Sequence, residues 1–287
     1  MRPRDRLLAL VVVVIWGVNF PATRLALDHF PPFLLGALRY LLLALPAIVL
    51  VPRPQTSWKW IIGAGLGIGT AQFAFLYLAM STGMPPGLAS IVLQASAPFT
   101  VLLAALLLGE RRSPAALAGV GVAISGLVVI GWYRAQVADV LPVLLTVLGG
   151  LGWACGNLCM RQARGANPLH MTMWLSVVPP IPLGLLSLSL DGPDRIRHAF
   201  GTAFTASALP AVGGLLYVVL LASVVGYGVW ALLMGRYPSS QIAPWSMLVP
   251  VVGVLSSWAA FGERPALAEV FGGLLVVGGI LYSSRRP

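Results

Sequence analysis

Residues 60–109 read WIIGAGLGIGTAQFAFLYLAMSTGMPPGLASIVLQASAPFTVLLAALLLG and contain no Asp, Glu, Lys or Arg. Residues 165–190 and 237–262 are also free of these four residue types. A helix that crosses the hydrocarbon core of a bilayer needs about 20 predominantly apolar residues. The charges are thus confined to short clusters between stretches long enough to span a membrane. This pattern predicts an all-α polytopic membrane protein.

The composition excludes a soluble protein. Hydrophobic residues make up 58% of the chain, charged residues only 9%, and the mean hydropathy is +0.90, whereas an average soluble domain is roughly 25% charged. The net charge of +10 does not indicate a nucleic-acid partner, because the basic residues are dispersed at helix ends with no aromatic residues interleaved. The expected partner of this surface is the lipid bilayer.

Ten spans fit the apolar stretches, separated by turn formers such as Pro31-Pro32 and Asn167-Pro168. The N-terminal segment resembles a signal peptide, but no small-residue cleavage motif follows it, so we expect it to be retained as the first span. An interfacial turn is expected within 195–209, before the eighth span. The expected spans are 6–27, 33–51, 58–81, 87–108, 114–132, 140–161, 168–190, 209–234, 239–261 and 266–284.

The basic residues orient these spans. With the N-terminus inside, the inner segments carry twelve Lys and Arg residues and the outer loops carry four, while Arg24 and Arg39 are left near the outer ends of the first two spans. Short loops rich in Lys and Arg stay in the cytoplasm. The sequence therefore predicts that both termini are cytoplasmic.

The chain also repeats itself. Gly109-Glu110-Arg111 recurs as Gly262-Glu263-Arg264, each followed by a Gly-rich apolar helix and each preceded, about a dozen residues upstream, by Pro98 or Pro250. Pro98 and Pro250 are candidates for breaks in their helices. Two units of five spans follow, residues 1–135 and 136–287. Because five is odd, the second unit must enter the membrane from the opposite side. This is the inverted repeat of many secondary transporters, whose binding site lies near the midplane between the halves.

The segment Trp16-Gly17-Val18-Asn19-Phe20, the duplicated Pro-to-Gly-Glu segments and the ten spans resemble the EamA branch of the drug/metabolite transporter superfamily. The resemblance covers the whole chain and is nearest to the YddG-type bacterial exporters. It implies a ten-helix secondary transporter of the bacterial inner membrane, which exports amino acids with aromatic and other apolar or neutral side chains by alternating access. Substrates vary widely in this superfamily, so the alternative is an exporter of drugs or other small metabolites.

The ionisable residues exclude several other functions. No Asp or Glu lies in the middle of an expected span, which argues against a carboxylate proton relay and favours facilitated diffusion or weakly coupled export. Phosphorylated substrates would require more Lys or Arg at the midplane. No acidic cluster, His ligand set or nucleophile with a base is present, so we expect no enzyme, no cofactor and no metal site. A monomer suffices for such a carrier.

Neutral polar and aromatic residues within the spans are the expected substrate-binding residues. An apolar cavity with a few amides suits a zwitterion that has an apolar side chain. The alternative for each amide is a hydrogen bond to a neighbouring helix, and for a Trp at a span end it is anchoring at the membrane interface. The candidates are Trp16, Asn19, Gln72, Phe75, Tyr77, Gln94, Trp153, Asn157, Tyr227, Trp230 and Trp245.

Three further residues are candidates for gating. Pro21 and Pro46 could kink helices that run in opposite directions and so open or close the path. Arg39 is expected near the outer face, where it snorkels to the interface, forms an outer gate, or contacts a substrate carboxylate on release. The glycines at positions 63, 65, 67 and 69 are expected to line one side of the third span, where they serve close packing or sliding of the two halves.

Overall fold

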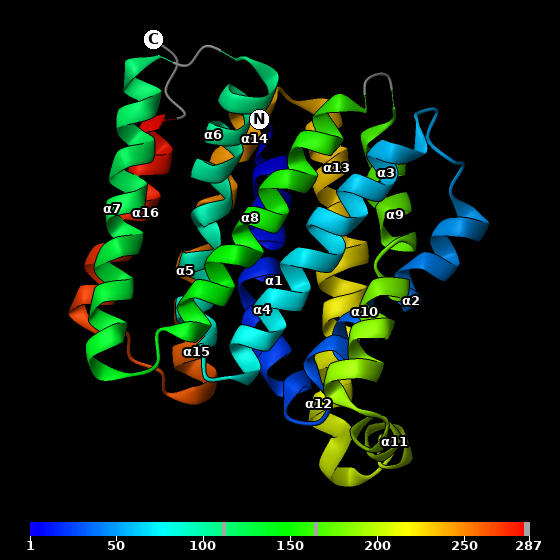
Figure 1. Ribbon diagram of the computed structural model, residues 1–287. Coiled ribbons are helices and arrows are strands. Elements are labelled where there is room, and N and C mark those ends of the chain that lie inside the picture. Colours follow the sequence, from blue (N-terminus) through cyan, green and yellow to red (C-terminus); the bar gives the residue numbers. More distant parts are fainter. Residues whose placement is uncertain (111–112, 164–165, 284–287) are drawn as a thin grey trace.

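The computed structural model describes residues 1–110, 113–163 and 166–283, and every regular element in these ranges is helical. The long helices run roughly along one axis, up and down the molecule (Figure 1). Eight helical segments are long and apolar enough to cross a membrane, and two shorter apolar helices, Val249–Phe261 and Leu267–Ser283, belong to the ninth and tenth spans. The predicted fold class is confirmed.

The first half contains five spans. The first two are the single helices α1 (Pro3–Leu27) and α2 (Pro32–Leu50), and the fifth is α7 (Pro114–Val137). The third span joins α3 (Trp58–Ala64), a π-helical segment η1 (Gly65–Ala71) and α4 (Gln72–Ser81). The fourth joins α5 (Pro86–Val92), a short 3₁₀ turn η2 (Leu93–Ala95) and α6 (Ser96–Leu108).

The second half begins with α8 (Leu141–Gln162). The seventh span consists of α9 (Pro168–Trp174), η3 (Leu175–Val177), α10 (Pro180–Leu186) and η4 (Ser187–Asp191). The eighth consists of η5 (Ala206–Ala208), α12 (Leu209–Leu216), the π-helical η6 (Tyr217–Val225) and α13 (Gly226–Arg236). The ninth consists of α14 (Ser239–Ser246) and α15 (Val249–Phe261), and the tenth is α16 (Leu267–Ser283).

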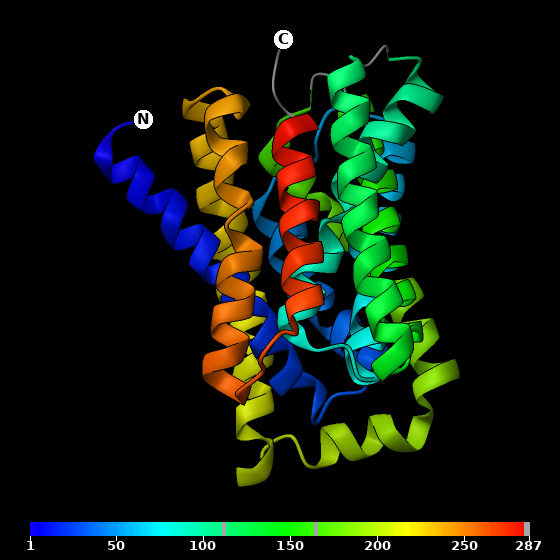
Figure 2. The ribbon, with the colours of Figure 1, turned by 90° about the vertical axis from the view of Figure 1, so that its left-hand side faces the viewer.

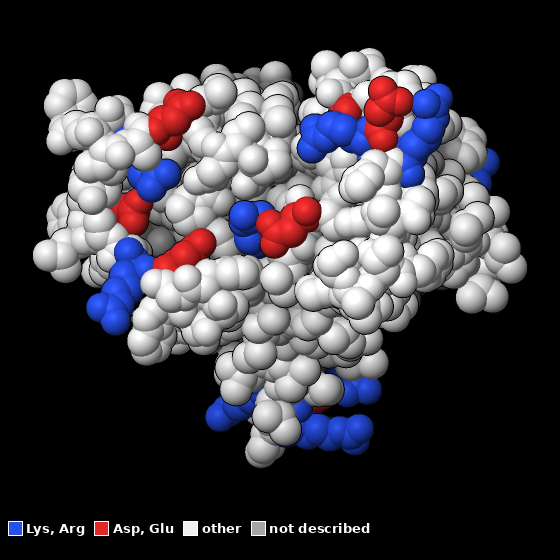
Figure 3. Space-filling view, turned by 90° about the horizontal axis from the view of Figure 1, so that it is seen from below, with Lys and Arg blue, Asp and Glu red and all other residues white. Residues whose placement is uncertain are grey.

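The start of α1 and the end of α16 lie at the same end of the bundle (Figures 1 and 2). Helix α6 ends there, whereas the turn between α15 and α16 lies at the opposite end (Figure 1). The two repeats therefore run in opposite directions. Figure 3 shows this opposite end, where acidic and basic side chains lie beside one another. Its ion pairs include Arg197 with Asp194 at 3.0 Å and Arg134 with Glu269 at 3.7 Å.

A short helix, α11 (Pro193–Gly201), lies across this same end, crosswise to the long helices (Figure 2). It falls where the sequence predicts an interfacial turn. His29 Nε2 lies 2.9 Å from the carbonyl oxygen of Ala199 and ties α11 to the turn after α1. The buried carboxylate of Asp191, just before α11, accepts a hydrogen bond of 2.9 Å from the backbone N–H of Leu34. This bond satisfies one of the free N–H groups at the start of α2.

Pro98 and Pro250 distort the fourth and ninth spans, as predicted. A proline inside a helix cannot donate to the carbonyl four residues before it, and its ring clashes with that carbonyl. Four residues before Pro98 is Gln94, at the centre of η2, and four residues before Pro250 is Ser246, where α14 ends. Neither Pro21 nor Pro46 has this effect, since α1 and α2 are continuous across them.

Helices α7 and α16 approach closely through glycines. A Cβ atom placed on Gly279 would lie 2.5 Å from the backbone nitrogen of Ala123 and 2.5 Å from the carbonyl oxygen of Gly119. Only the absence of a side chain permits this separation.

The expectation that four glycines line one side of the third span is wrong. A Cβ on Gly63 would meet Cys159, and one on Gly67 would meet Gly156, so both glycines face α8. Gly65 and Gly69 instead face the seventh span at Val178 and Pro179. Each helical residue rotates the chain by roughly 100°, so glycines two apart point to nearly opposite sides. The third span is thus wedged between two spans of the second half.

Candidate functional site

Three of the predicted aromatic residues form one cluster, where α1 meets α13. The ring centroids of Trp16 and Tyr227 are 5.4 Å apart, and those of Trp16 and Trp230 are 5.0 Å apart. The indole N–H of Trp16 donates a hydrogen bond of 3.0 Å to the carbonyl oxygen of Ala222. Trp245 lies nearby, because it and Trp230 pack against the same buried apolar cluster. The cluster joins the first half of the chain to the second.

Trp153 and Asn157 form a second group, on α8. The indole of Trp153 donates to the Asn157 side-chain oxygen at 3.1 Å, and the Asn157 amide donates to the Thr100 hydroxyl at 3.4 Å. Thr100 belongs to α6, so this network also crosses between the halves. Asn157 thus makes a hydrogen bond to a neighbouring helix.

Gln94 lies at the distorted point of the fourth span. Its side-chain nitrogen is 3.9 Å from the sulfur of Met247, which lies in the two-residue gap between α14 and α15. The two interrupted spans therefore meet at their interruptions. An inverted-repeat carrier places its binding site where such discontinuous helices approach one another.

Asn19 and Gln72 each keep a buried side-chain oxygen without a hydrogen-bond partner among the described residues. Buried polar atoms are nearly always paired, so an unpaired acceptor requires an explanation. A substrate ammonium group would supply the missing donors. Phe75, the remaining aromatic candidate on α4, packs against the main apolar core without a polar contact of its own.

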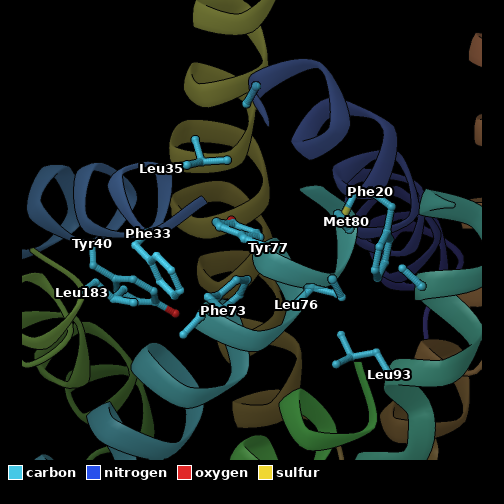
Figure 4. Close-up of a cluster of buried hydrophobic side chains, with 14 of the residues drawn as sticks. Phe20, Phe33, Leu35, Tyr40, Phe73, Leu76, Tyr77, Met80, Leu93 and Leu183 are labelled. Carbon is cyan, nitrogen blue, oxygen red and sulfur yellow. The ribbon is translucent and has the colours of Figure 1, made fainter. Parts of the chain in front are cut away.

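Tyr77 belongs to a buried aromatic group in which Phe73 lies between Tyr77 and Tyr40. It is fully buried, and its ring centroid is 5.3 Å from that of Phe73, which in turn lies 5.6 Å from Tyr40 (Figure 4). The Tyr77 hydroxyl accepts a hydrogen bond of 2.9 Å from Arg39.

The prediction that Arg39 snorkels to the interface is wrong, since only 3% of the residue is exposed. Arg39 is seven residues into α2, about 10 Å along the helix from its start. Its NH2 group donates at 3.0 Å to the Ser223 hydroxyl on η6, and this bond joins the two halves. Arg39 is the one buried cation in the part of the chain that the structure describes.

Two surface hollows lie away from these clusters. One of about 460 Å³ is lined by Leu107, Leu108, Glu110, Arg161 and Gln162, and one of about 320 Å³ by Val254, Leu255, Trp258, Arg264 and Pro265. None of the predicted substrate-binding residues lines either hollow. Of the candidate residues, Gln72 and Tyr77 are buried, and the others are partly exposed.

Charged groups join the halves at both ends of the bundle. At the end with the termini, buried Asp5 accepts from Arg236 at 3.1 Å and from the Tyr237 hydroxyl at 2.6 Å. Glu110 there pairs with Arg161. At the other end, Glu263 accepts a bond of 3.3 Å from the backbone N–H of Gly87 at the start of α5. Partial burial raises the pKa of the Glu263 carboxyl above its ordinary value.

Sequence reasoning missed Ser223, Phe73 and Thr100 as members of these groups. Ser223 carried a usable signal, because it is the one polar side chain between Tyr217 and Tyr227. A lone hydroxyl in a spanning helix is expected to face other helices rather than lipid. Phe73 carried no such signal, since its role depends on the guanidinium of Arg39, which lies over its ring.

Comparison with known proteins places this architecture in a family. The model of the EamA-like transporter family matches residues 6–132 and again residues 140–285. The chain belongs to the EamA-like transporter family. It is therefore a multi-pass membrane transporter rather than an enzyme, and its two matched segments correspond to the two halves described above.

Relatives match over nearly the whole chain. A protein of Escherichia coli K12 named "Probable amino-acid metabolite efflux pump" is 40% identical over 98% of this chain and 94% of its own. A Streptantibioticus cattleyicolor protein named "Probable terminal-alkyne amino-acid exporter" is 28% identical over 96% of this chain and 92% of its own. A solved crystal structure with 22% identity covers 99% of this chain and 97% of its own, with a TM-score of 0.60, and supports the fold alone.

Proposed function

We propose that this transporter exports amino acids and their metabolites, chiefly those with aromatic or other apolar or neutral side chains, as the YddG-type exporters do. The two halves, residues 1–135 and 136–287, form one transport unit that alternates access to the two sides of the membrane. The Escherichia coli relative, whose name describes amino-acid metabolite efflux, supports the class of substrate. A monomer contains every part that this mechanism requires.

The observation that carries the proposal is the chemistry gathered between the halves. Aromatic side chains of both halves pack together around Trp16, and the buried oxygens of Asn19 and Gln72 have no partner. Such neutral groups suit a zwitterion whose side chain is apolar. The eleven predicted residues are assigned to substrate binding on this basis, with Asn19 and Gln72 as acceptors for the ammonium group.

Charge supports a cytoplasmic location for both termini in a bacterial inner membrane. Among the described residues, seven Lys and Arg residues lie in segments at the end of the bundle where α1 begins (Figure 1), and four lie in the loops at the opposite end. The seven are Arg2, Arg4, Arg6, Arg53, Lys59, Arg161 and Arg236, and the four are Arg134, Arg195, Arg197 and Arg264. Positive residues are retained on the cytoplasmic side. Export then runs from this end toward the end that α11 covers.

Arg39, Pro21 and Pro46 are assigned to gating. The bond from Arg39 to Ser223 links α2 of the first half to η6 of the second. Opening the end of the bundle near α11 would break this bond. Pro21 and Pro46 lower the cost of bending α1 and α2 during that movement, because each removes one backbone hydrogen bond inside its helix.

The test is counterflow in liposomes that contain the purified protein. Labelled Phe, Trp and Met should exchange faster than Asp and Lys. Trp16→Ala should slow the exchange at least about tenfold, which corresponds to the loss of about 1.4 kcal/mol of binding to the transition state. Trp132→Ala is the matched control, because Trp132 is 72% exposed and should tolerate the change. Movement of cationic dyes without any amino acid would replace this proposal with a drug exporter.

A further inference from the structure

Arg39 has an environment that leaves its charge unmatched. The guanidinium makes two hydrogen bonds, to the hydroxyls of Tyr77 at 2.9 Å and Ser223 at 3.0 Å. An arginine has five N–H donors, and the Nε group of Arg39 is buried without a partner. Among the described residues, no Asp or Glu forms an ion pair with Arg39 within 4.0 Å, because every ion pair there involves another arginine.

Aromatic rings offset only part of the free-energy cost of burying the charge of Arg39. The guanidinium carbon lies 4.0 Å from the centroid of Phe73 and 5.7 Å from that of Tyr40. Ring faces attract a cation, but they carry no net negative charge. An arginine is charged at every relevant pH, and a charge buried at membrane depth is costly and typically marks a ligand pathway. The missing component is an anion.

We propose that Arg39 is the anchor for the carboxylate of the substrate. This inference rests on the proposed function, and it names the group of the amino acid that Arg39 recognises. The planar guanidinium can hold both carboxylate oxygens through parallel hydrogen bonds. The Tyr77 hydroxyl accepts from Arg39 and keeps its own proton, so it can donate to the same carboxylate.

The surroundings favour a carboxylate with an apolar side chain over a phosphate. Arg39 is the one cation among the buried described residues, and a phosphate dianion would require a second positive group. The Trp16 indole donates to the carbonyl oxygen of Ala222 at 3.0 Å, and the next residue in the chain, Ser223, accepts from Arg39. The charge therefore borders the aromatic cluster that would receive the side chain.

The same contact couples binding to movement. The Ser223 hydroxyl donates to the carbonyl oxygen of Val218 at 2.8 Å and accepts from Arg39. A carboxylate that takes the NH2 group of Arg39 displaces Ser223. The link between α2 and η6 is then lost only when substrate is bound. The empty carrier therefore keeps the end of the bundle near α11 closed.

The experiment compares acids with their uncharged analogues. Phenylalanine, phenylalaninamide and phenethylamine compete against labelled phenylalanine in counterflow on liposomes that contain the wild type, Arg39→Gln or Arg39→Lys. The wild type should prefer the acid at least about tenfold over the amide and the amine. Arg39→Gln should lose that preference to within about twofold, while Arg39→Lys should keep part of it, because Lys retains the charge without the planar fork.

Arg134→Gln is the matched control. Its side chain is 15% exposed and pairs with Glu269, so the variant also loses a half-buried arginine but should keep the preference for the acid. Equal competition by phenylalanine and its amide in the wild type overturns the anchor, and this result needs no variant to fold. An unchanged preference in folded Arg39→Gln overturns it as well.

Failure of the proposed function gives a different result. If no amino acid exchanges, the thermal stability of the detergent-purified protein is measured with phenylalanine, 3-phenylpropionate and phenylalaninamide. Arg39 still anchors a carboxylate, of a substrate other than an amino acid, if phenylalanine and 3-phenylpropionate stabilise the wild type, phenylalaninamide does not, and Arg39→Gln loses the stabilisation. Equal effects of all three compounds overturn it.

Discussion

Replacing Gly67 by Ala should destabilise the contact between the halves. The new Cβ would lie 2.5 Å from the backbone nitrogen of Gly156 and 2.7 Å from the carbonyl oxygen of Gly152, whereas ordinary contacts are 3.4–4 Å. Both neighbours are backbone atoms of α8, which cannot rotate away as a side chain could. The two spans must therefore separate by about 1 Å in an interior that is packed as densely as an organic crystal.

The magnitude follows from two opposing terms. Overpacking of this kind costs about 1–3 kcal/mol, while Ala stabilises a helix by up to about 1 kcal/mol relative to Gly. Gly184→Ala in α10 is the matched control, because a Cβ on Gly184 meets nothing within 4 Å. The helix term is similar in both variants, so Gly67→Ala should be less stable than Gly184→Ala by about 1–3 kcal/mol.

Denaturant titration of the detergent-purified proteins, followed by tryptophan fluorescence, measures the difference in free energy of unfolding. Counterflow in liposomes measures whether the separation also disturbs transport, which we expect because the contact lies between the halves. Equal stability of the two variants would refute the reasoning, since it would mean that η1 and α8 do not approach as closely as described.

Two further predictions concern groups at the end of the bundle near α11. Asp191→Ala should lower the free energy of unfolding by about 1–3 kcal/mol, because the buried Leu34 N–H loses its acceptor. Asp194→Ala is the control and should change the free energy of unfolding little, because the Asp194 side chain is 95% exposed. Equal losses in the two variants would contradict the role of Asp191 as this acceptor. Burial raises the pKa of Glu263, so the folded state holds this proton more tightly than the unfolded state. The resulting stabilisation is complete below the ordinary pKa of 4.5 and is lost as pH rises through the higher folded value. The free energy of unfolding of the wild type minus that of Glu263→Gln should therefore fall as pH rises from 4.5 through the folded pKa. A difference that stays constant or rises with pH would contradict this prediction.

Local properties of the chain were sufficient to predict the spans and the interruptions of the fourth and ninth spans. A helix in lipid must be apolar over a known length and must satisfy its backbone hydrogen bonds internally, so hydropathy and charge mark its ends. Proline acts on the carbonyl four residues before it, so Pro98 and Pro250 marked the distorted points of the fourth and ninth spans before any contact was known.

The site was predicted only in part. Trp16, Tyr227 and Trp230 were chosen as isolated aromatic residues, and the structure shows that they touch. Asn157 was chosen on the same grounds, and it bonds Thr100 of another helix. Residue type indicated which side chains have polar or aromatic chemistry, but their partners lie tens or hundreds of positions away in the chain.

Hydropathy along the chain thus determined how many helices there are, where they begin and end, and that the two halves are inverted. Tertiary packing decided that Arg39 is enclosed by Tyr77 and Ser223 instead of reaching the interface, and that the glycines of η1 meet two different spans. The physical reason is that one-dimensional hydropathy measures the cost of placing a segment in lipid. It contains no term for which face of that segment meets which neighbour, and that choice arises only when all helices pack together.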